Sequence, residues 1–99
     1  MLHIVNKSPL TSASFDSCLR VVQAGAAVLL IEDGIYAATV GTSAAERLRA
    51  AGNGLRIYAL GPDIEARGMG DRVAPGIETV DYAGFVDLVA QSRSVQSWL

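Results

Sequence analysis

Apolar residues gather in short runs that alternate along the chain with polar, glycine-containing segments. The runs cover residues 2–5, 27–31, 55–60 and 77–80, and residues 27–31 are apolar at every position. A continuous apolar run of this length is typical of a strand in a parallel sheet that is covered on both faces. We therefore predict four strands at these runs, and residues 94–99 can add a further strand at the edge of the sheet.

Between the first two strands, apolar residues recur at helical spacing. The stripe consists of Phe15, Cys18, Leu19 and Val22. Ser12 is the expected N-cap of this helix, and Gly25 is expected to stop it. Asp16 and Arg20 are spaced to pair across one turn. The segment therefore predicts an amphipathic helix with one face on the sheet.

A second helix is expected over residues 44–51. Thr42 or Ser43 can cap it, and Glu46 is placed to complete a capping box with Ser43. The sequence Gly-Asn-Gly at residues 52–54 is expected to stop it.

The last third of the chain predicts two more helices. A short one is expected over residues 64–67, after the sequence Gly-Pro-Asp at 61–63, and a longer one after Asp81 as N-cap. Phe85, Leu88 and Val89 line one face of the longer helix. Residues 35–40 are expected to form one helical turn and a loop.

Strands that alternate with helices indicate right-handed βαβ crossovers, which place the strands in parallel. We therefore expect an α/β fold in which residues 1–99 form one domain, a parallel sheet with helices on both faces. The sequence contains no internal repeat, low-complexity block or linker.

The composition predicts association with other subunits. Apolar residues make up 51% of the chain and charged residues 18%, with a mean hydropathy of +0.32, which excludes a disordered chain. A domain of this size buries only about 60–68% of the surface that its unfolded chain exposes. An apolar content above the usual ~45–50% therefore leaves apolar surface for partners to cover.

Charge and segment length exclude other partners. Eight Lys and Arg residues against ten Asp and Glu give a net charge of -2, with the basic residues dispersed, so direct nucleic-acid binding is not expected. The apolar stretch at residues 24–31 is far shorter than the roughly 18–20 residues of a membrane-spanning helix, and no signal peptide precedes it. We therefore expect a cytoplasmic protein with no membrane partner.

Motifs for cofactors are weak or missing. The sequence has no P-loop, and Gly68-Met69-Gly70 lacks the third glycine of a dinucleotide fingerprint because Val73 stands there. One cysteine and one histidine cannot form an intrachain disulfide or an N/S metal site. No metal or organic cofactor is expected.

Acidic residues follow two of the predicted strands. Glu32 and Asp33 stand where parallel sheets bind ligands, so they can bind a cation or act as acid and base. They can equally be solvated residues at a strand end where Gly34 makes the turn. Asp63 and Arg67 are spaced to pair on a helix face, which is a structural contact rather than a catalytic one.

The histidine and the cysteine each allow a structural reading. His3, in an apolar strand, is expected to be a hydrogen-bonded structural residue. Cys18 lies ~50° from the centre of its apolar stripe at ~100° per residue, and no neighbour one turn away lowers its pKa. A packed small hydrophobic residue and a sulfur-carrying thiol both remain open for Cys18.

Several segments, in order and over essentially the whole chain, resemble the DsrH/TusB family. They are MLHIVNKSP at 1–9, SCL at 17–19, LLIEDGIYAA at 29–38, YALGPD at 58–63, ARG at 66–68, DYAGFVDL at 81–88 and VQSWL at 95–99. No single segment is a catalytic signature. The resemblance implies a flavodoxin-like (DsrE-like) parallel sheet.

The resemblance also implies a function, as the small subunit of a cytoplasmic sulfur-relay complex. It implies a heterohexamer with two copies each of this chain, a DsrE/TusD-like subunit and a DsrF/TusC-like subunit. Persulfide sulfur would pass to a DsrC/TusE-type acceptor, for 2-thiouridine in the tRNA wobble position or for dissimilatory sulfur oxidation. Such thiol exchange requires no metal or organic cofactor.

Within that family, Cys18 in the sequence Ser17-Cys18-Leu19 resembles the cysteine of the DsrH branch, which favours sulfur oxidation. The resemblance makes Cys18 a possible persulfide carrier, although the main accepting cysteine lies on the DsrE/TusD subunit. Two alternatives stay open. The chain can be a non-catalytic scaffold that docks partners through apolar surface such as Val21, or an unrelated flavodoxin-like small-molecule-binding domain with its ligand near Asp33 and Asp63.

Overall fold

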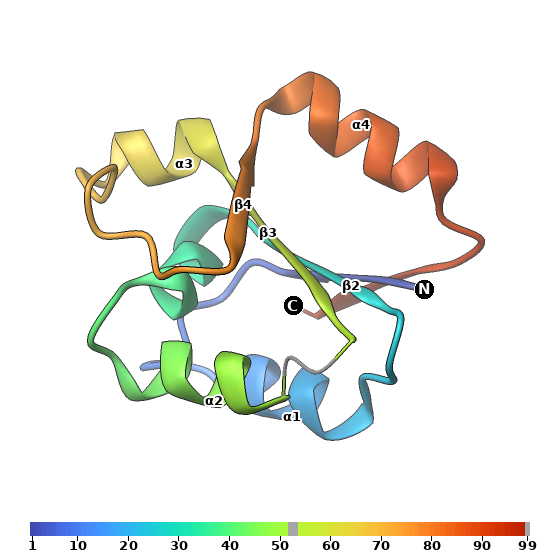
Figure 1. Cartoon of the computed structure of the whole chain (residues 1–99), viewed down its shortest axis with the longest axis horizontal. Helices are drawn as coiled ribbons and strands as arrows, with labels where there is room; N and C mark the ends of the chain where they lie inside the picture. Colours follow the sequence, from blue (N-terminus) through green and yellow to red (C-terminus); the bar gives the residue numbers. More distant parts are fainter. Residues whose placement is uncertain (52–53, 99) are drawn as a thin grey trace.

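The five strands of the computed structural model form one parallel sheet in the order β4-β3-β2-β1-β5 (Figure 1). The structure describes residues 1–51 and 54–98. The strands are β1 Leu2–Val5, β2 Ala27–Leu30, β3 Arg56–Leu60, β4 Ile77–Val80 and β5 Val95–Trp98. The four predicted strands and the predicted edge strand are therefore confirmed, with β2 and β3 each one residue shorter than expected.

The direction of each crossover decides which face a helix covers. The chain passes from β1 to β4 in one direction across the sheet, so right-handed crossovers place the connecting elements on one face. The helix α1 Ser14–Val21, the 3₁₀ helix η1 Glu32–Ala38 and α2 Ser43–Ala51 pack there, and α3 Gly61–Ala66 joins the same core. The return from β4 to β5 places α4 Tyr82–Gln91 over the opposite face, where Phe85 and Leu88 pack (Figure 1).

Each face of the sheet has its own apolar core. The core under α1, η1 and α2 contains the largest set of buried side chains, including Phe15, Leu30 and Leu48. The core under α4 is smaller. It consists of Leu2, Ile4, Ala27 and Leu29, with Phe85 and Leu88 of α4 packed against it. Strands β1 and β2 are buried at every position because both cores rest on them, which explains their unbroken apolar runs.

The first helix begins and ends differently from the prediction. Its N-cap is Ala13, one residue later than the predicted Ser12, whose Oγ accepts a hydrogen bond from the N–H of Ser14 (3.2 Å). The helix ends at Val21 rather than near Gly25, whose positive φ of 87° instead shapes the turn into β2.

The charges predicted to pair within α1 have other partners. Asp16 forms an ion pair with Arg47 of α2 (2.7 Å), and Arg20 donates to the hydroxyl of Ser17 (3.2 Å). The ion pair therefore ties α1 to α2, where the spacing rule predicted a bond within one helix.

Two other helix caps follow the sequence rules. Thr42 Oγ1 accepts the N–H of Ala45 (3.1 Å) and Asp81 Oδ1 accepts that of Gly84 (2.8 Å), as expected. The predicted capping box is wrong, because Ser43 is already helical and Glu46 binds Arg49 instead (2.6 Å). The predicted stop at Gly52 and Asn53 lies outside the described residues.

Two short helices start earlier than predicted. The 3₁₀ helix η1 begins directly after β2 at Glu32 and runs to Ala38, whereas one turn within residues 35–40 was expected. Helix α3 begins at Gly61, directly after β3, because Pro62 has a preset helical φ and tolerates the first turn. Within residues 1–51 and 54–98, no helix is long and apolar enough to cross a bilayer.

Candidate functional site

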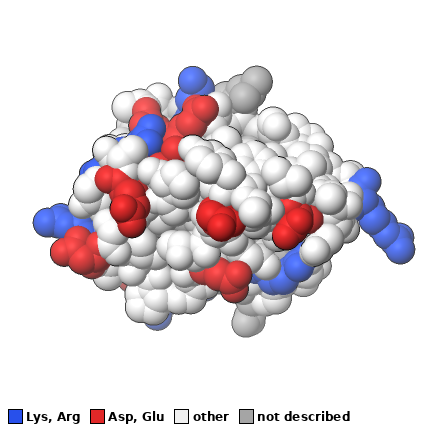
Figure 2. Space-filling model, turned by 90° about the horizontal axis from the view of Figure 1, so that it is seen from above, with Lys and Arg blue, Asp and Glu red and all other residues white. Residues whose placement is uncertain are grey.

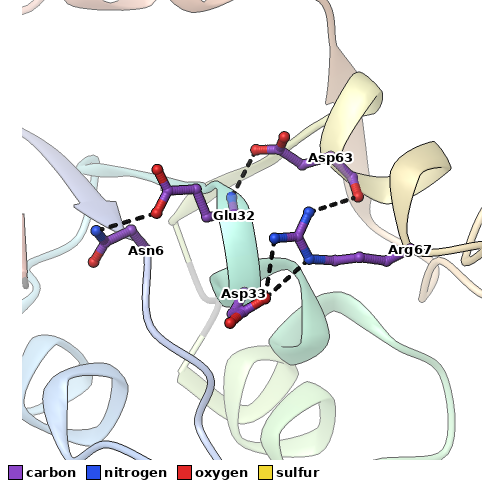
Figure 3. Close-up of polar contacts among 5 residues, drawn as sticks. All are labelled: Asn6, Glu32, Asp33, Asp63 and Arg67. Atoms are coloured by element: carbon purple, nitrogen blue, oxygen red, sulfur yellow. Dashed lines mark hydrogen bonds and ion pairs between the residues drawn. The ribbon is translucent and has the colours of Figure 1, made fainter.

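Polar side chains from three consecutive strand ends meet at the carboxyl edge of the sheet (Figure 3). They are Asn6 after β1, Glu32 and Asp33 after β2, and, after β3, Asp63 of α3 and Arg67, which caps the C-terminus of α3. Glu32–Asp33 and Asp63–Arg67 follow two different strands in the sequence, and the parallel sheet brings the two pairs together. Ligands of α/β proteins bind at this kind of edge, so it is the first place to look for a site.

Arg67 holds the centre of this cluster. Its Nε and Nη2 each lie 3.0 Å from Asp33 Oδ1, and its Nη1 donates to the main-chain carbonyl of Asp63 (3.2 Å) (Figure 3). The prediction that Arg67 pairs with the Asp63 carboxylate is therefore wrong. Its ionic partner comes from the neighbouring strand end, and the pair fixes α3 against η1.

The Asp63 carboxylate binds the backbone of the next loop. Its Oδ2 accepts the N–H of Glu32 at 2.6 Å, where Glu32 has a left-handed φ of 50°. Asn6 Nδ2 lies 3.5 Å from Glu32 Oε2, while Asn6 Oδ1 is buried without a partner. The acceptor on Asp63 offsets part of the backbone strain at Glu32.

Gly34 makes the turn at this edge because only glycine fits. A Cβ on Gly34 would stand 2.2 Å from the carbonyl oxygen of Val5. The N–H of Gly34 donates to Ile31 O (2.8 Å), which closes the turn after β2. These contacts support the interpretation that the residues at this strand end have a structural role.

The cluster uses most of its charge internally. Asp33 and Asp63 both bind groups of the protein, and no set of three or more His, Cys, Asp or Glu residues in the described part of the chain could hold a metal ion. The contacts stabilise the junction of β1, η1 and α3. They do not assemble a nucleophile with a base.

Cys18 lies inside the larger core and not on its margin. Its side chain is 0% exposed, in the same core as Phe15, Val28 and Leu48. Burial raises the pKa of the Cys18 thiol to about 11, because removal from water disfavours the thiolate. In this conformation Cys18 behaves as a small hydrophobic residue.

His3 has a partner that sequence reasoning missed. Trp98 Nε1 donates to His3 Nδ1 (3.1 Å), and the two rings are stacked with centroids 6.2 Å apart. Because Nδ1 accepts, a neutral His3 carries its proton on Nε2. Burial, and next the positive charge of the N-terminus, lower the pKa of His3 from 6.5. His3 is thus the hydrogen-bonded structural residue that the sequence predicted.

The register of the edge strand is the signal that could have found Trp98. In parallel pairing His3 lies opposite Gln96, and Trp98 follows two residues later on the same face. The two aromatic residues border a groove of about 520 Å³, which Val21 and Gln96 also line.

The comparison with protein families decides the relationship. The model of the family described as "DsrH like protein" matches residues 7–95. The chain belongs to the DsrH-like family. Protein TusB of Pectobacterium parmentieri and protein TusB of Escherichia coli O81 (strain ED1a) are each 37% identical to it over 98 residues, which is 99% of this chain and 100% of theirs. The predicted DsrH/TusB resemblance is therefore confirmed.

Solved structures with the same fold are more distant in sequence from this DsrH-like chain. The ychN protein of E. coli is 16% identical with a TM-score of 0.79, covering 97% of both chains. The protein MTH1491 of Methanobacterium thermoautotrophicum, titled as of unknown function, is 17% identical with a TM-score of 0.69, covering 97% of this chain and 95% of that one. At these identities the likeness confirms the α/β fold.

Proposed function

We propose that this chain is a subunit of a cytoplasmic sulfur-relay complex that acts in tRNA thiolation or dissimilatory sulfur oxidation. The observation that carries the proposal is family membership over nearly the whole chain, with TusB relatives 37% identical over 98 residues. Residues 1–99 form its single domain in this proposal. The apolar content of 51% supports a subunit that other chains cover.

The proposed partners are a DsrE/TusD-like and a DsrF/TusC-like subunit, with two copies of each chain in the complex. The acceptor is a DsrC/TusE-type protein. Relay chemistry requires only accessible thiols: an attacking thiolate bonds to the outer sulfur of a donor persulfide, the donor S–S bond breaks, and the donor leaves as a thiolate. No metal or organic cofactor takes part.

The structure favours a scaffold role for this subunit over a carrier role for Cys18. The Cys18 side chain is fully buried, and a thiol with a pKa of about 11 is ionised in about one molecule in ten thousand at pH 7. Sulfur transfer to Cys18 would require α1 to move away from the sheet. The carrier role of Cys18, and the DsrH branch that it favours, stay predictions.

The decisive experiment is sulfur transfer by the reconstituted three-subunit complex. The wild-type complex and a Cys18→Ala complex receive a persulfide donor, and labelled acceptor is followed over time with mass analysis of every subunit. The scaffold role predicts equal rates and no added sulfur on this chain. A slower Cys18→Ala complex, with an added sulfur atom on wild-type Cys18, would establish the carrier role.

Alanine is the matched substitution because it fits an apolar site without a polar atom. Cys18→Ser places a hydroxyl in the core, so a loss seen only with serine reports packing rather than chemistry. If the three wild-type chains form no complex and transfer no sulfur, the proposed function is wrong.

A further inference from the structure

Helix α4 is apolar over a wide part of its circumference, and much of that apolar part lies on the surface. Among its ten residues only Asp87 and Gln91 are strongly polar, and none is buried. Tyr82, Val86 and Val89 expose 61%, 64% and 37% of their surface. A helix on a protein surface normally turns a polar face outward, so α4 has the composition of a covered helix.

The apolar residues of α4 form one continuous arc, of which one part faces the sheet and the other is exposed. At ~100° per residue, Tyr82, Val86 and Val89 fall within about 60° of one another, while Phe85 and Leu88 turn toward the sheet. The exposed set continues onto β5. Val95 is 42% exposed and shares a sheet face with its register partner Leu2, which belongs to the core under α4. We call Tyr82, Val86, Val89 and Val95 the α4 stripe.

One helix is too narrow to cover this face. A helix is about 10 Å wide, whereas the four spacings of a five-stranded sheet span about 19 Å. Exposed residues flank α4 accordingly: Glu78 of β4 on one side, and Val95 and Ser97 of β5 on the other. The opposite face is covered by α1, η1, α2 and α3.

Exposed acidic residues lie on the same side of the molecule as the α4 stripe. Glu78, Asp81 and Asp87 are exposed, and Glu65 and Asp81 line a groove of about 630 Å³ between α3 and the start of α4. None of these four forms an ion pair within the described residues. Seen from the α4 side, several Asp and Glu residues lie in the middle of the face, others lie at the left beside basic residues, and most Lys and Arg lie toward the outline (Figure 2).

We propose that the α4 stripe docks a different polypeptide whose contact surface is apolar at its centre and carries Lys or Arg beside it. A second copy fits less well, because residues 77–98, which carry this face, contain one basic residue, Arg93, against the three acids Glu78, Asp81 and Asp87. Two copies joined through this face would therefore leave most of these acids without a cation. A basic side chain opposite Asp87 and the acidic groove resolves this.

This inference rests on the proposed function, because it names the surface through which the proposed complex assembles. The test uses this chain co-purified with the DsrE/TusD-like and DsrF/TusC-like subunits, with native mass spectrometry and measured affinity. Val86→Arg is expected to weaken assembly at least about tenfold. Asp87→Lys is expected to weaken it about threefold and to flatten its dependence on salt.

Matched controls are available elsewhere on the chain. Val40→Arg changes a valine that is 53% exposed, and Asp71→Lys changes an exposed acid in the α3–β4 segment. Both controls are expected to assemble like the wild type. Melting temperatures of all four variants verify that they are folded.

Each outcome decides between the alternatives. Normal assembly of Val86→Arg and Asp87→Lys overturns the docking surface and leaves the proposed function intact. A dimer of the isolated chain that Val86→Arg converts to a monomer shows that the occupant is a second copy, which also overturns the inference. Failure of the wild-type chains to assemble overturns both proposals.

Discussion

The indole N–H of Trp98 in β5 donates to Nδ1 of His3 in β1, 95 positions away in the sequence. This bond joins the edge strand β5 to its neighbour β1 through side chains as well as through the backbone. Because His3 is only 4% exposed, bulk water cannot replace Trp98 as the hydrogen-bond donor to its ring.

Trp98→Phe removes the donor and is expected to lower the free energy of unfolding by about 1–2 kcal/mol, because Nδ1 of His3 is then buried without a partner. Chemical denaturation measures this. In a double-mutant cycle with His3→Leu, the two substitutions should show a coupling of about 1 kcal/mol. Strictly additive effects would mean that the bond contributes nothing.

Stability should depend on the protonation of His3. Its pKa is lowered from 6.5 in the folded protein, so the unfolded chain takes up the proton first as the pH falls. The contribution of neutral His3 is complete above pH 6.5 and is lost as the pH falls toward the folded pKa. The expected slope is at most about 1.4 kcal/mol per pH unit.

Thermal melting curves recorded from about pH 7.5 to about pH 5, a range that brackets the ordinary histidine pKa, test this pH dependence of stability. His3→Gln cannot titrate there, and should flatten the curve. An equally steep curve for His3→Gln would assign the pH dependence to other groups.

Gly34→Ala is expected to destabilise the fold by about 2–4 kcal/mol, because the new Cβ meets the backbone of Val5 at 2.2 Å and the backbone cannot rotate away. Gly70 offers the matched control. A Cβ at Gly70 meets nothing within 4 Å, so Gly70→Ala should be neutral or slightly stabilising. Equal effects at both positions would contradict the close approach of η1 to β1.

The Cys18 thiol should react with alkylating reagents only when the core opens. We expect labelling about a hundredfold slower than that of a surface thiol, with the difference abolished in denaturant. The comparison protein is the double variant Cys18→Ala, Val21→Cys, since Val21 is 54% exposed on the same helix. Similar rates for the two thiols in native buffer would show that Cys18 is accessible.

The sheet was predictable because its signal is local. Residues 27–31 are apolar at each position, and alternation of strands and helices implies the crossovers that set the two layers. Side-chain partners were not predictable in the same way. Arg67 was assigned to Asp63 by helical spacing, yet it binds Asp33 from another strand end, and Asp16 likewise binds Arg47. Spacing rules apply within a single isolated helix. In the folded chain, a neighbouring element can bring an opposite charge closer than the one predicted within the helix.

The candidate residues show the same limit. Helical spacing placed Cys18 ~50° from the centre of its apolar stripe. In the structure, η1 and α2 contribute to the same core and widen it, so the thiol is buried. In the sequence, Trp98 is notable only as part of the segment VQSWL, which resembles the family. Its link to His3 depends on the register of two strands at opposite ends of the sequence, which no local pattern encodes.

The position of β5 has a consequence for the order of events during synthesis. Strands β1 to β4 can pair as they leave the ribosome, each with the strand before it, because every crossover among them is local. The backbone groups on one edge of β1 stay unpaired until residues 95–98 emerge. Until β5 arrives, the sheet formed by β1 to β4 therefore carries an open edge at β1, and the pairing of β5 covers that edge.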